Sequence, residues 1–164
     1  MALGSAVLAR KMLISAAMAA ENKTDTVIIS RVPPKKMLLV DDVPDLARAM
    51  ETMLLKLGHT VEVSPDGKDA LTRYKPGKFD LVITDYSMPR MNGVELAEIL
   101  KRRSAEQLIL MVTAYTFTIA AYDGRPLPVD AILRKPFRPK EFNDTLAELF
   151  VPKAADETSM AQPA

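Results

Sequence analysis

The sequence contains no cysteine and only one histidine among its 164 residues. The absence of cysteine excludes disulfides, thiolate metal sites and cysteine nucleophiles, and a single histidine excludes nearly all histidine-based catalysis. Any chemistry must therefore depend on carboxylates, hydroxyls, lysines or a bound cation. We expect the one histidine, His59, to be an exposed loop residue that follows Gly58.

Nucleotide-binding motifs and a strong charge bias are also missing. Neither Gly-x-Gly-x-x-Gly nor Gly-x-x-x-x-Gly-Lys-Ser/Thr occurs in the sequence. Residues 1–36 carry six basic and two acidic residues, whereas residues 37–150 carry fifteen basic and seventeen acidic residues. A near-neutral domain has no electrostatic footprint for nucleic acid, and no apolar run approaches the roughly 20 residues of a membrane-spanning helix. We therefore predict neither a nucleic-acid partner nor a membrane partner.

The length fits one domain of ordinary size with tails. We expect an N-terminal extension of undetermined structure at 1–34, a domain at 35–151 and a short C-terminal tail at 152–164. The extension is rich in Ala, Leu and Met, which is compatible with an export signal, a loosely amphipathic helix or a translation start placed too early. Two consecutive prolines, Pro33 and Pro34, favour a linker after it.

Apolar runs of strand length alternate with stretches of helical periodicity. The predicted strands are 37–40, 60–63, 81–84, 108–112 and 131–133, and the predicted helices are 44–57, 67–74, 94–103 and 139–150. This alternation predicts an α/β fold with βαβ units and right-handed crossovers. We expect a flavodoxin-like, doubly wound parallel sheet of five strands in the order 2-1-3-4-5, with helices on both faces.

Polar residues follow four of the predicted strands: Asp41 and Asp42, Asp85, Thr113, and Lys135. Because the carboxyl ends of parallel strands meet at one edge, we expect these side chains to converge. Three nearby carboxylates stay ionised only around a cation, and oxygen ligands without His or Cys favour Mg²⁺. A hydroxyl and an ammonium beside that cation suit a phosphate-sized anion, and one carboxylate can act as nucleophile toward phosphorus.

Simpler interpretations exist for each of these residues. Asp41 and Asp42 could be helix caps, Thr113 an ordinary strand end, and Lys135 a surface lysine before a turn proline. The register of the acidic residues with Lys135 argues against these simpler interpretations.

The same residues carry a resemblance to a known family. Asp41-Asp42, Asp85 followed by Met88-Pro89 and Gly93, Thr113-Ala114, and Lys135-Pro136-Phe137 resemble the signature of the response-regulator receiver domain. The resemblance covers roughly residues 36–150, and five separated elements coincide in the right order.

The resemblance implies a role for each matching residue. Asp85 would accept the phosphoryl group, Thr113 would contact it and Lys135 would pair with it. Asp42 would bind Mg²⁺ directly and Asp41 through water, while Asp85 and the backbone carbonyl of Ser87 would complete the protein ligands. The Lys135–Pro136 peptide bond is expected to be cis.

By this resemblance the protein is a cytoplasmic, stand-alone response regulator. It would take phosphate from a phosphohistidine on a histidine kinase or phosphotransfer protein, and would signal to a downstream protein through a changed protein–protein surface. It would be a phospho-accepting module with slow loss of its own phosphate rather than a turnover enzyme. The alternatives are a phosphate-independent binding module and a Mg²⁺-dependent aspartyl-phosphate hydrolase of the haloacid-dehalogenase type, which requires Asp-x-Asp instead of adjacent acids.

Two departures from the family pattern stand out. The family usually has an aromatic residue three positions before the lysine, where this sequence has Ile132. Tyr115 or Tyr122 could partly replace that aromatic residue, or signalling could depend on loop ordering alone. The segment 122–128 contains Gly and two prolines, so we expect little room for the helix that normally separates the fourth and fifth strands.

Overall fold

The computed structural model describes residues 30–114 and 126–150. Its elements in chain order are β1 (Lys36–Val40), α2 (Pro44–Lys56), β2 (Thr60–Ser64), α3 (Gly67–Arg73), β3 (Leu81–Asp85), α4 (Gly93–Arg103), β4 (Leu108–Thr113), β5 (Ala131–Arg134) and α5 (Pro139–Phe150). The strands form one parallel sheet in the order β2-β1-β3-β4-β5. This confirms the predicted fold class and strand order.

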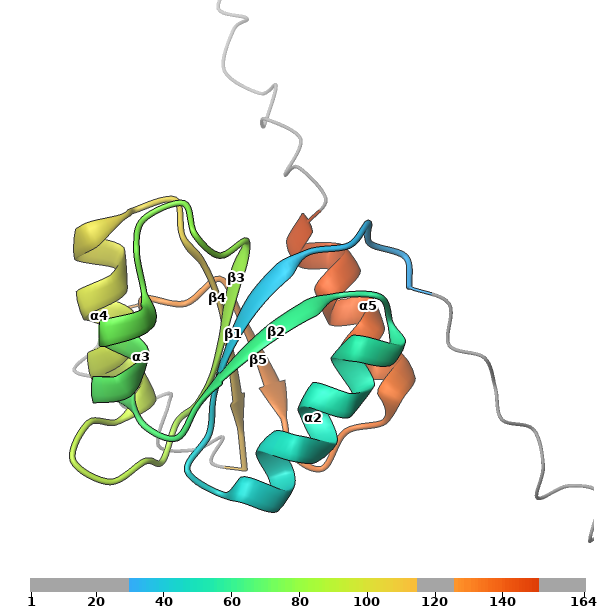
Figure 1. Ribbon diagram of the computed structural model, residues 1–164, viewed down its shortest axis with the longest axis horizontal. Helices are drawn as coiled ribbons and strands as arrows, with labels where there is room; N and C mark the ends of the chain where they lie inside the picture. The colour runs from blue at the N-terminus through green and yellow to red at the C-terminus, as the bar shows by residue number, and fades with distance from the viewer. Residues whose placement is uncertain (1–29, 115–125, 151–164) are drawn as a thin grey trace, which may run out of the picture.

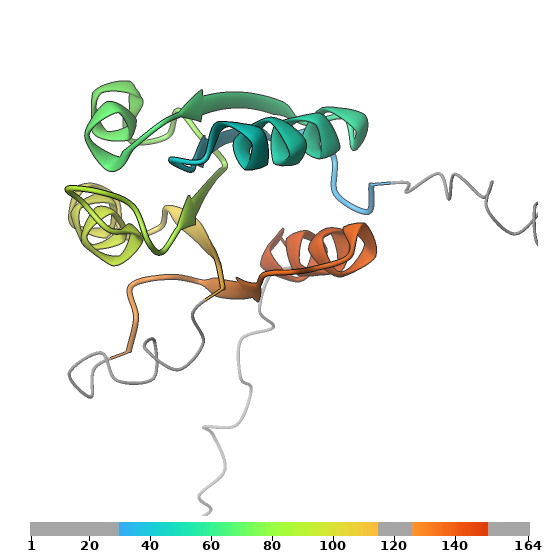
Figure 2. The ribbon, with the colours of Figure 1, turned by 90° about the horizontal axis from the view of Figure 1, so that it is seen from below.

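The helices form a layer on each face of the sheet, as the two perpendicular views show (Figure 1, Figure 2). Helices α2 and α5 cover one face, and α3 and α4 cover the other. Side chains alternate along each strand, so Leu39 and Ile83 pack toward α2 and α5 while Leu38 and Val82 pack toward α3 and α4. The central strands are therefore buried on both faces, which explains their unbroken apolar sequences.

Local sequence signals fix the ends of the helices. Pro44 begins α2, where its missing N–H would have no helical partner in any case. The side chain of Asp66 caps α3 by accepting a hydrogen bond from the amide of Asp69 at 2.9 Å. Gly58 follows α2 with a φ of 87°, a left-handed conformation that glycine adopts readily.

The expectation of an exposed His59 is wrong, since only 2% of the residue is exposed. Gly58 turns the chain directly into β2, which pairs with β1 from its first residue. The amide of Lys35 donates to His59 Nδ1 at 3.2 Å, and Nε2 has no hydrogen-bond partner among the described residues. Burial, together with the charge of Lys35, lowers the pKa of His59.

The structure describes only part of the region in which the sequence departs from the receiver-domain pattern. Tyr115, Tyr122 and the segment up to residue 125 lie outside the described residues, whereas residues 126–130 are described and contain no helix. Ile132 lies on β5 with 43% of its surface exposed. Among the described residues, no helix is long and apolar enough to cross a membrane.

Candidate functional site

Three of the predicted site residues meet at the carboxyl edge of the sheet. The Nζ atom of Lys135 lies 3.1 Å from Asp41 Oδ2 and 2.7 Å from Asp85 Oδ1. Asp85 is the last residue of β3, while Asp41 directly follows β1 and Lys135 directly follows β5. Parallel register brings these positions together although up to 94 residues separate them in the sequence.

The three side chains are largely shielded from water. The exposed fractions of the side chains are 3% for Asp41, 12% for Asp85 and 17% for Lys135. Charges in such a place are stable only when paired and hydrogen-bonded, and here one ammonium is shared by two carboxylates. The arrangement leaves one negative charge in excess, which favours an additional cation at this edge.

Each carboxylate is also fixed by a backbone amide of the loop that follows its strand. The amide of Val43 donates to Asp41 Oδ1 at 2.9 Å, and the amide of Ser87 donates to Asp85 Oδ2 at 2.6 Å. Helix α2 is capped at Val43 without a side-chain hydrogen bond, so neither Asp41 nor Asp42 is its cap residue. This removes the simpler helix-cap interpretation of the two acids.

The other predicted site residues are close in the fold but less directly joined. Thr113 is fully buried, and its carbonyl accepts a hydrogen bond from the amide of Lys135 at 2.8 Å. Ser87 is exposed, and Asp42 is half-buried and forms no hydrogen bond or ion pair with the described residues. The Lys135–Pro136 peptide bond is cis, as expected.

The donor set at this edge suits a hard cation. Asp41, Asp42, Asp85 and the carbonyl of Ser87 offer only oxygen atoms, which Mg²⁺ prefers. In the described part of the chain, however, no three His, Cys, Asp or Glu side chains already form a group that could hold a metal ion. Lys135 engages one oxygen of Asp41 and one of Asp85, yet each carboxylate oxygen keeps a further lone pair, so the residues fit Mg²⁺ by their chemistry.

The loop after β3 is tied to the neighbouring helix. Arg90, which has a φ of 69°, donates to Asp66 Oδ2 at 2.5 Å. The amide of Asp69 and the guanidinium of Arg90 hold the pKa of Asp66 below its ordinary value. This pair connects the loop that carries Ser87 to the beginning of α3.

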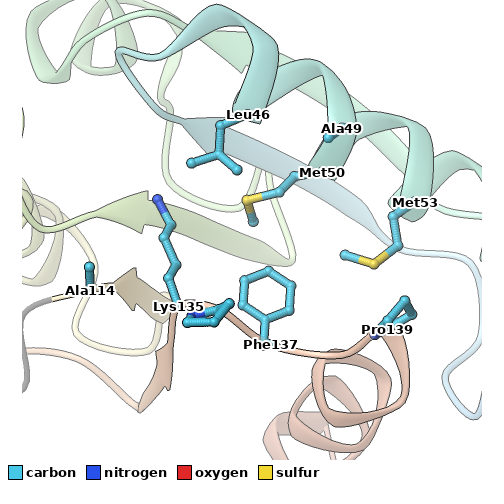
Figure 3. Close-up of a pocket in the computed structure, with 9 residues that line it drawn as sticks. Leu46, Ala49, Met50, Met53, Ala114, Lys135, Phe137 and Pro139 are labelled. Atoms are coloured by element: carbon cyan, nitrogen blue, oxygen red, sulfur yellow. The ribbon is translucent and has the colours of Figure 1, made fainter.

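An apolar cleft opens beside Lys135, between α2 and the segment that joins β5 to α5 (Figure 3). Its volume is about 430 Å³, and its apolar lining includes Leu46, Ala49, Met50, Met53, Phe137 and Pro139. The apolar residues of α2 recur at helical spacing and form one stripe along the helix. Leu46 is only half-buried and Ala49 is exposed, so part of that stripe lines the cleft instead of the core.

Curated proteins of similar sequence include two bacterial regulators. The chain is 36% identical over 107 residues to the DNA-binding response regulator MtrA of Mycolicibacterium smegmatis, covering 65% of this chain and 46% of MtrA. It is 32% identical over 109 residues to the alkaline phosphatase synthesis transcriptional regulatory protein PhoP of Bacillus subtilis, covering 66% of this chain and 45% of PhoP. The chain thus spans about half the length of the curated relatives it matches.

The prediction that this protein has no nucleic-acid partner is wrong in the light of these relatives. MtrA is a DNA-binding response regulator, and PhoP is a transcriptional regulatory protein. The prediction rested on the near-neutral charge of residues 37–150. That charge describes only the region shared with these relatives and has no bearing on the other half of their length.

Solved structures give the same picture of the fold. The chemotaxis protein CheY4 of Vibrio cholerae is 30% identical, with a TM-score of 0.64 over 71% of this chain and 99% of that chain. The response regulator TrrA of Thermotoga maritima, in complex with Mg²⁺ and BeF, is 27% identical, with a TM-score of 0.64 over 70% and 98% of the two chains.

A family model provides the assignment. The model of the response regulator receiver domain matches residues 37–147, which include Asp41, Asp85, Thr113 and Lys135. Receiver domains are phospho-accepting modules of two-component systems, whose partners are histidine kinases, and the family generally depends on Mg²⁺. This chain belongs to the response regulator receiver domain family.

Proposed function

We propose that the receiver domain accepts a phosphoryl group on Asp85 from a phosphohistidine, with Mg²⁺, and signals by changing a protein–protein surface. The observation that carries the proposal is the pair of short contacts from Lys135 Nζ to Asp41 and Asp85 in a largely buried site. The proposal covers residues 35–151, because the curated relatives are about twice as long as the region that they share with this chain.

The proposed reaction transfers a phosphoryl group from the imidazole nitrogen of the phosphohistidine to a carboxylate oxygen of Asp85. A carboxylate oxygen of Asp85 forms a bond to phosphorus while the phosphorus–nitrogen bond of the phosphohistidine breaks, and the imidazole leaves with the electron pair. The ammonium of Lys135 offsets the negative charge of the phosphoryl oxygens, and Thr113 contacts the group from the end of β4. The amide of Ser87 holds Asp85 in place through Oδ2.

The metal would be held by Asp42 directly, by Asp41 through water, by Asp85 and by the carbonyl of Ser87. When bound, Mg²⁺ supplies a positive charge that stabilises the phosphoryl oxygens. The complex of TrrA with Mg²⁺ and BeF supports this part of the proposal. We also propose that the phosphate is lost slowly by hydrolysis. The proposed location is the cytoplasm, where phosphohistidine donors occur.

The cleft beside Lys135 supports a protein as the phosphate donor. Its apolar walls reach from α2 to Phe137 and end at the lysine, so an apolar helix that carries the phosphohistidine can pack there. The variant Ala49→Glu should slow transfer from a phosphorylated donor protein about 10-fold or more, because it places a charge in the cleft. The rate with acetyl phosphate, which needs no cleft, should stay within about twofold; equal loss with both donors would contradict this docking site.

The first experiment is intact-protein mass spectrometry after incubation with acetyl phosphate and Mg²⁺. Wild type should gain one phosphoryl group, whereas Asp85→Ala and a sample treated with chelator should gain none. Asp80→Ala is the matched control, because Asp80 precedes the same strand at its opposite end. Absence of an adduct on folded wild type would contradict the proposal.

The sequence is also compatible with two alternatives to phosphoryl transfer by a receiver domain. The hydrolase alternative is not supported, since the family is the receiver domain and the acids are adjacent. A phosphate-independent binding module is favoured by one observation, the exposed Ile132 where the family usually has an aromatic residue. The same mass measurement decides between this alternative and phosphoryl transfer.

A further inference from the structure

Helix α4 begins directly against the backbone of Asp85. A β-carbon built on Gly93, the first residue of α4, would overlap the carbonyl oxygen of Asp85 and would lie 3.0 Å from its carbonyl carbon. Real β-carbons essentially never show contacts this short with backbone atoms. Only glycine permits this approach between the helix and the strand.

The hydroxyl of Thr84 contacts the same carbonyl group of Asp85. Thr84 is fully buried, and its Oγ1 donates to the carbonyl oxygen of Asp85 at 3.0 Å. A β-carbon on Gly93 would lie 3.2 Å from this hydroxyl, so the two residues enclose one carbonyl group. The backbone of Asp85 is therefore held by contacts separate from those that hold its carboxylate.

The beginning of α4 cannot easily move away to relieve such an overlap. The side chain of Asn92 accepts hydrogen bonds from the amides of Val94 and Glu95, both at 2.9 Å, and Glu95 accepts one from the amide of Asn92. The amide of Gly93 donates to the carbonyl of Tyr86 at 2.9 Å. This last bond joins the two ends of the loop between β3 and α4.

We propose that Gly93 and Thr84 are positioning residues for Asp85: together they fix the backbone of the phosphoryl acceptor against α4. The proposal rests on the proposed function of Asp85 and adds the residues that set its placement. A β-carbon at Gly93 forces Asp85 away from Lys135 and from the amide of Ser87. Because reaction rates fall steeply when a reacting group is displaced by about 1 Å, the first expected effect is on the rate of phosphorylation.

The main test compares Gly93→Ala with Gly67→Ala. Gly67 is the first residue of α3, and the three atoms nearest to a β-carbon there all belong to the flexible side chain of Met91, with Sδ at 2.7 Å. The same substitution at the same helix position thus differs only in what the new methyl group meets. With acetyl phosphate and Mg²⁺, Gly93→Ala should react about 10- to 100-fold more slowly than wild type, and Gly67→Ala within about twofold.

A second readout needs neither metal nor phosphate. The amide proton of Ser87, which donates to a carboxylate at 2.6 Å, should resonate well downfield in the NMR spectrum of the metal-free protein. The resonance should move upfield in Gly93→Ala and stay in place in Gly67→Ala. A folded Gly93→Ala variant with an unchanged resonance and an unchanged rate would overturn the proposal.

The Thr84 variants decide the matter if Gly93→Ala does not fold. Thr84→Val keeps the shape and removes the hydroxyl, so the rate should fall about fivefold, whereas Thr84→Ser should restore it to within about twofold of wild type. Equal rates for Thr84→Val, Thr84→Ser and wild type would overturn the proposal. If wild type itself takes no phosphoryl group, the proposed function fails, and the Ser87 resonance in the same variants still tests the placement of Asp85.

Discussion

The two edges of the sheet use aspartates in different ways. At the amino edge, Asp80 and Asp130 stand immediately before β3 and β5, and each exchanges two hydrogen bonds with a residue of the adjacent strand. Asp80 donates its amide to the carbonyl of Lys36 and accepts from its amide, both at 2.8 Å. Asp130 does the same with Ile109, at 2.9 and 2.8 Å.

At the carboxyl edge, Asp41 and Asp85 accept from the loops that follow their own strands and share Lys135. At the amino edge each aspartate pairs with its own lysine, and these lysines are more exposed than Lys135. Lys35 Nζ lies 3.6 Å from Asp80 Oδ1, and Lys101 Nζ lies 2.9 Å from Asp130 Oδ2. Carboxylates that join two strands hold the sheet together, whereas the carboxylates that share one half-buried lysine belong to the site that we propose for phosphoryl transfer.

The largest expected effect is that of Lys135→Met on phosphorylation. Removal of the shared ammonium should slow phosphorylation by acetyl phosphate about 100-fold or more, because two carboxylates and the phosphoryl oxygens lose their compensating charge. Lys101→Met removes a lysine with a carboxylate partner at the other edge and should change the rate by less than about twofold. Similar losses in the two variants, measured as initial rates of adduct formation, would erase the distinction between the edges.

Asp130→Ala should have the next largest effect, on stability. The variant leaves the buried amide of Ile109 without its acceptor, so the free energy of unfolding should fall by about 2 kcal/mol. Urea unfolding of wild type and variant measures the difference. Asp130→Asn keeps an acceptor oxygen and should recover part of the loss, and the phosphorylation rate of the folded variants should not change. A greater loss of stability from Asp85→Ala than from Asp130→Ala would reverse the comparison.

The pH dependence of stability should reveal His59, which lies at the amino edge. Because burial lowers its pKa in the folded state, the unfolded state binds the proton more tightly. Stability should therefore decline as the pH falls below about 6.5, the ordinary value for histidine, until the folded-state pKa is passed. Urea unfolding across this range should show a flatter profile for His59→Gln than for wild type, and identical slopes would contradict the assignment.

The smallest expected effect belongs to the partly exposed ion pairs of Glu62 on β2. Its pKa is lowered chiefly by a hydrogen bond from Lys78, and Lys36 adds a second cation at 3.2 Å. Glu62→Gln should lower the free energy of unfolding by less than about 0.5 kcal/mol, since exposed ion pairs contribute little. About 1 M salt should remove the remaining difference between variant and wild type. A loss larger than that of Asp130→Ala would contradict this ranking.

The sequence predicted the sheet well because its signals are strong and local. Unbroken apolar runs such as 81–84 mark strands buried on both faces, and Pro44 and Gly58 mark the ends of a helix. The convergence of Asp41, Asp85 and Lys135 followed from parallel topology alone. The roles of these residues in phosphoryl transfer remain predictions.

Other features could not be predicted because they depend on contacts between distant segments. The burial of His59 results from the pairing of β2 with β1, and the cleft results from the placement of Phe137 opposite α2. The contact of Gly93 with Asp85 had a visible signal, a glycine immediately before the predicted helix 94–103, but only coordinates show what a side chain would meet there. The expected roles of Tyr115 and Tyr122 lie outside the described residues.

The order in which the site residues occur along the chain has a practical consequence. Asp41 and Asp85 precede Thr113, whereas Lys135 follows Ala131. A chain divided anywhere between Thr113 and Ala131 therefore carries its two acids on one fragment and their shared cation on the other. Neither fragment holds a complete site, so recovered phosphorylation on mixing would report reassembly of β5 onto β4, and the domain could serve as a split reporter of its own assembly.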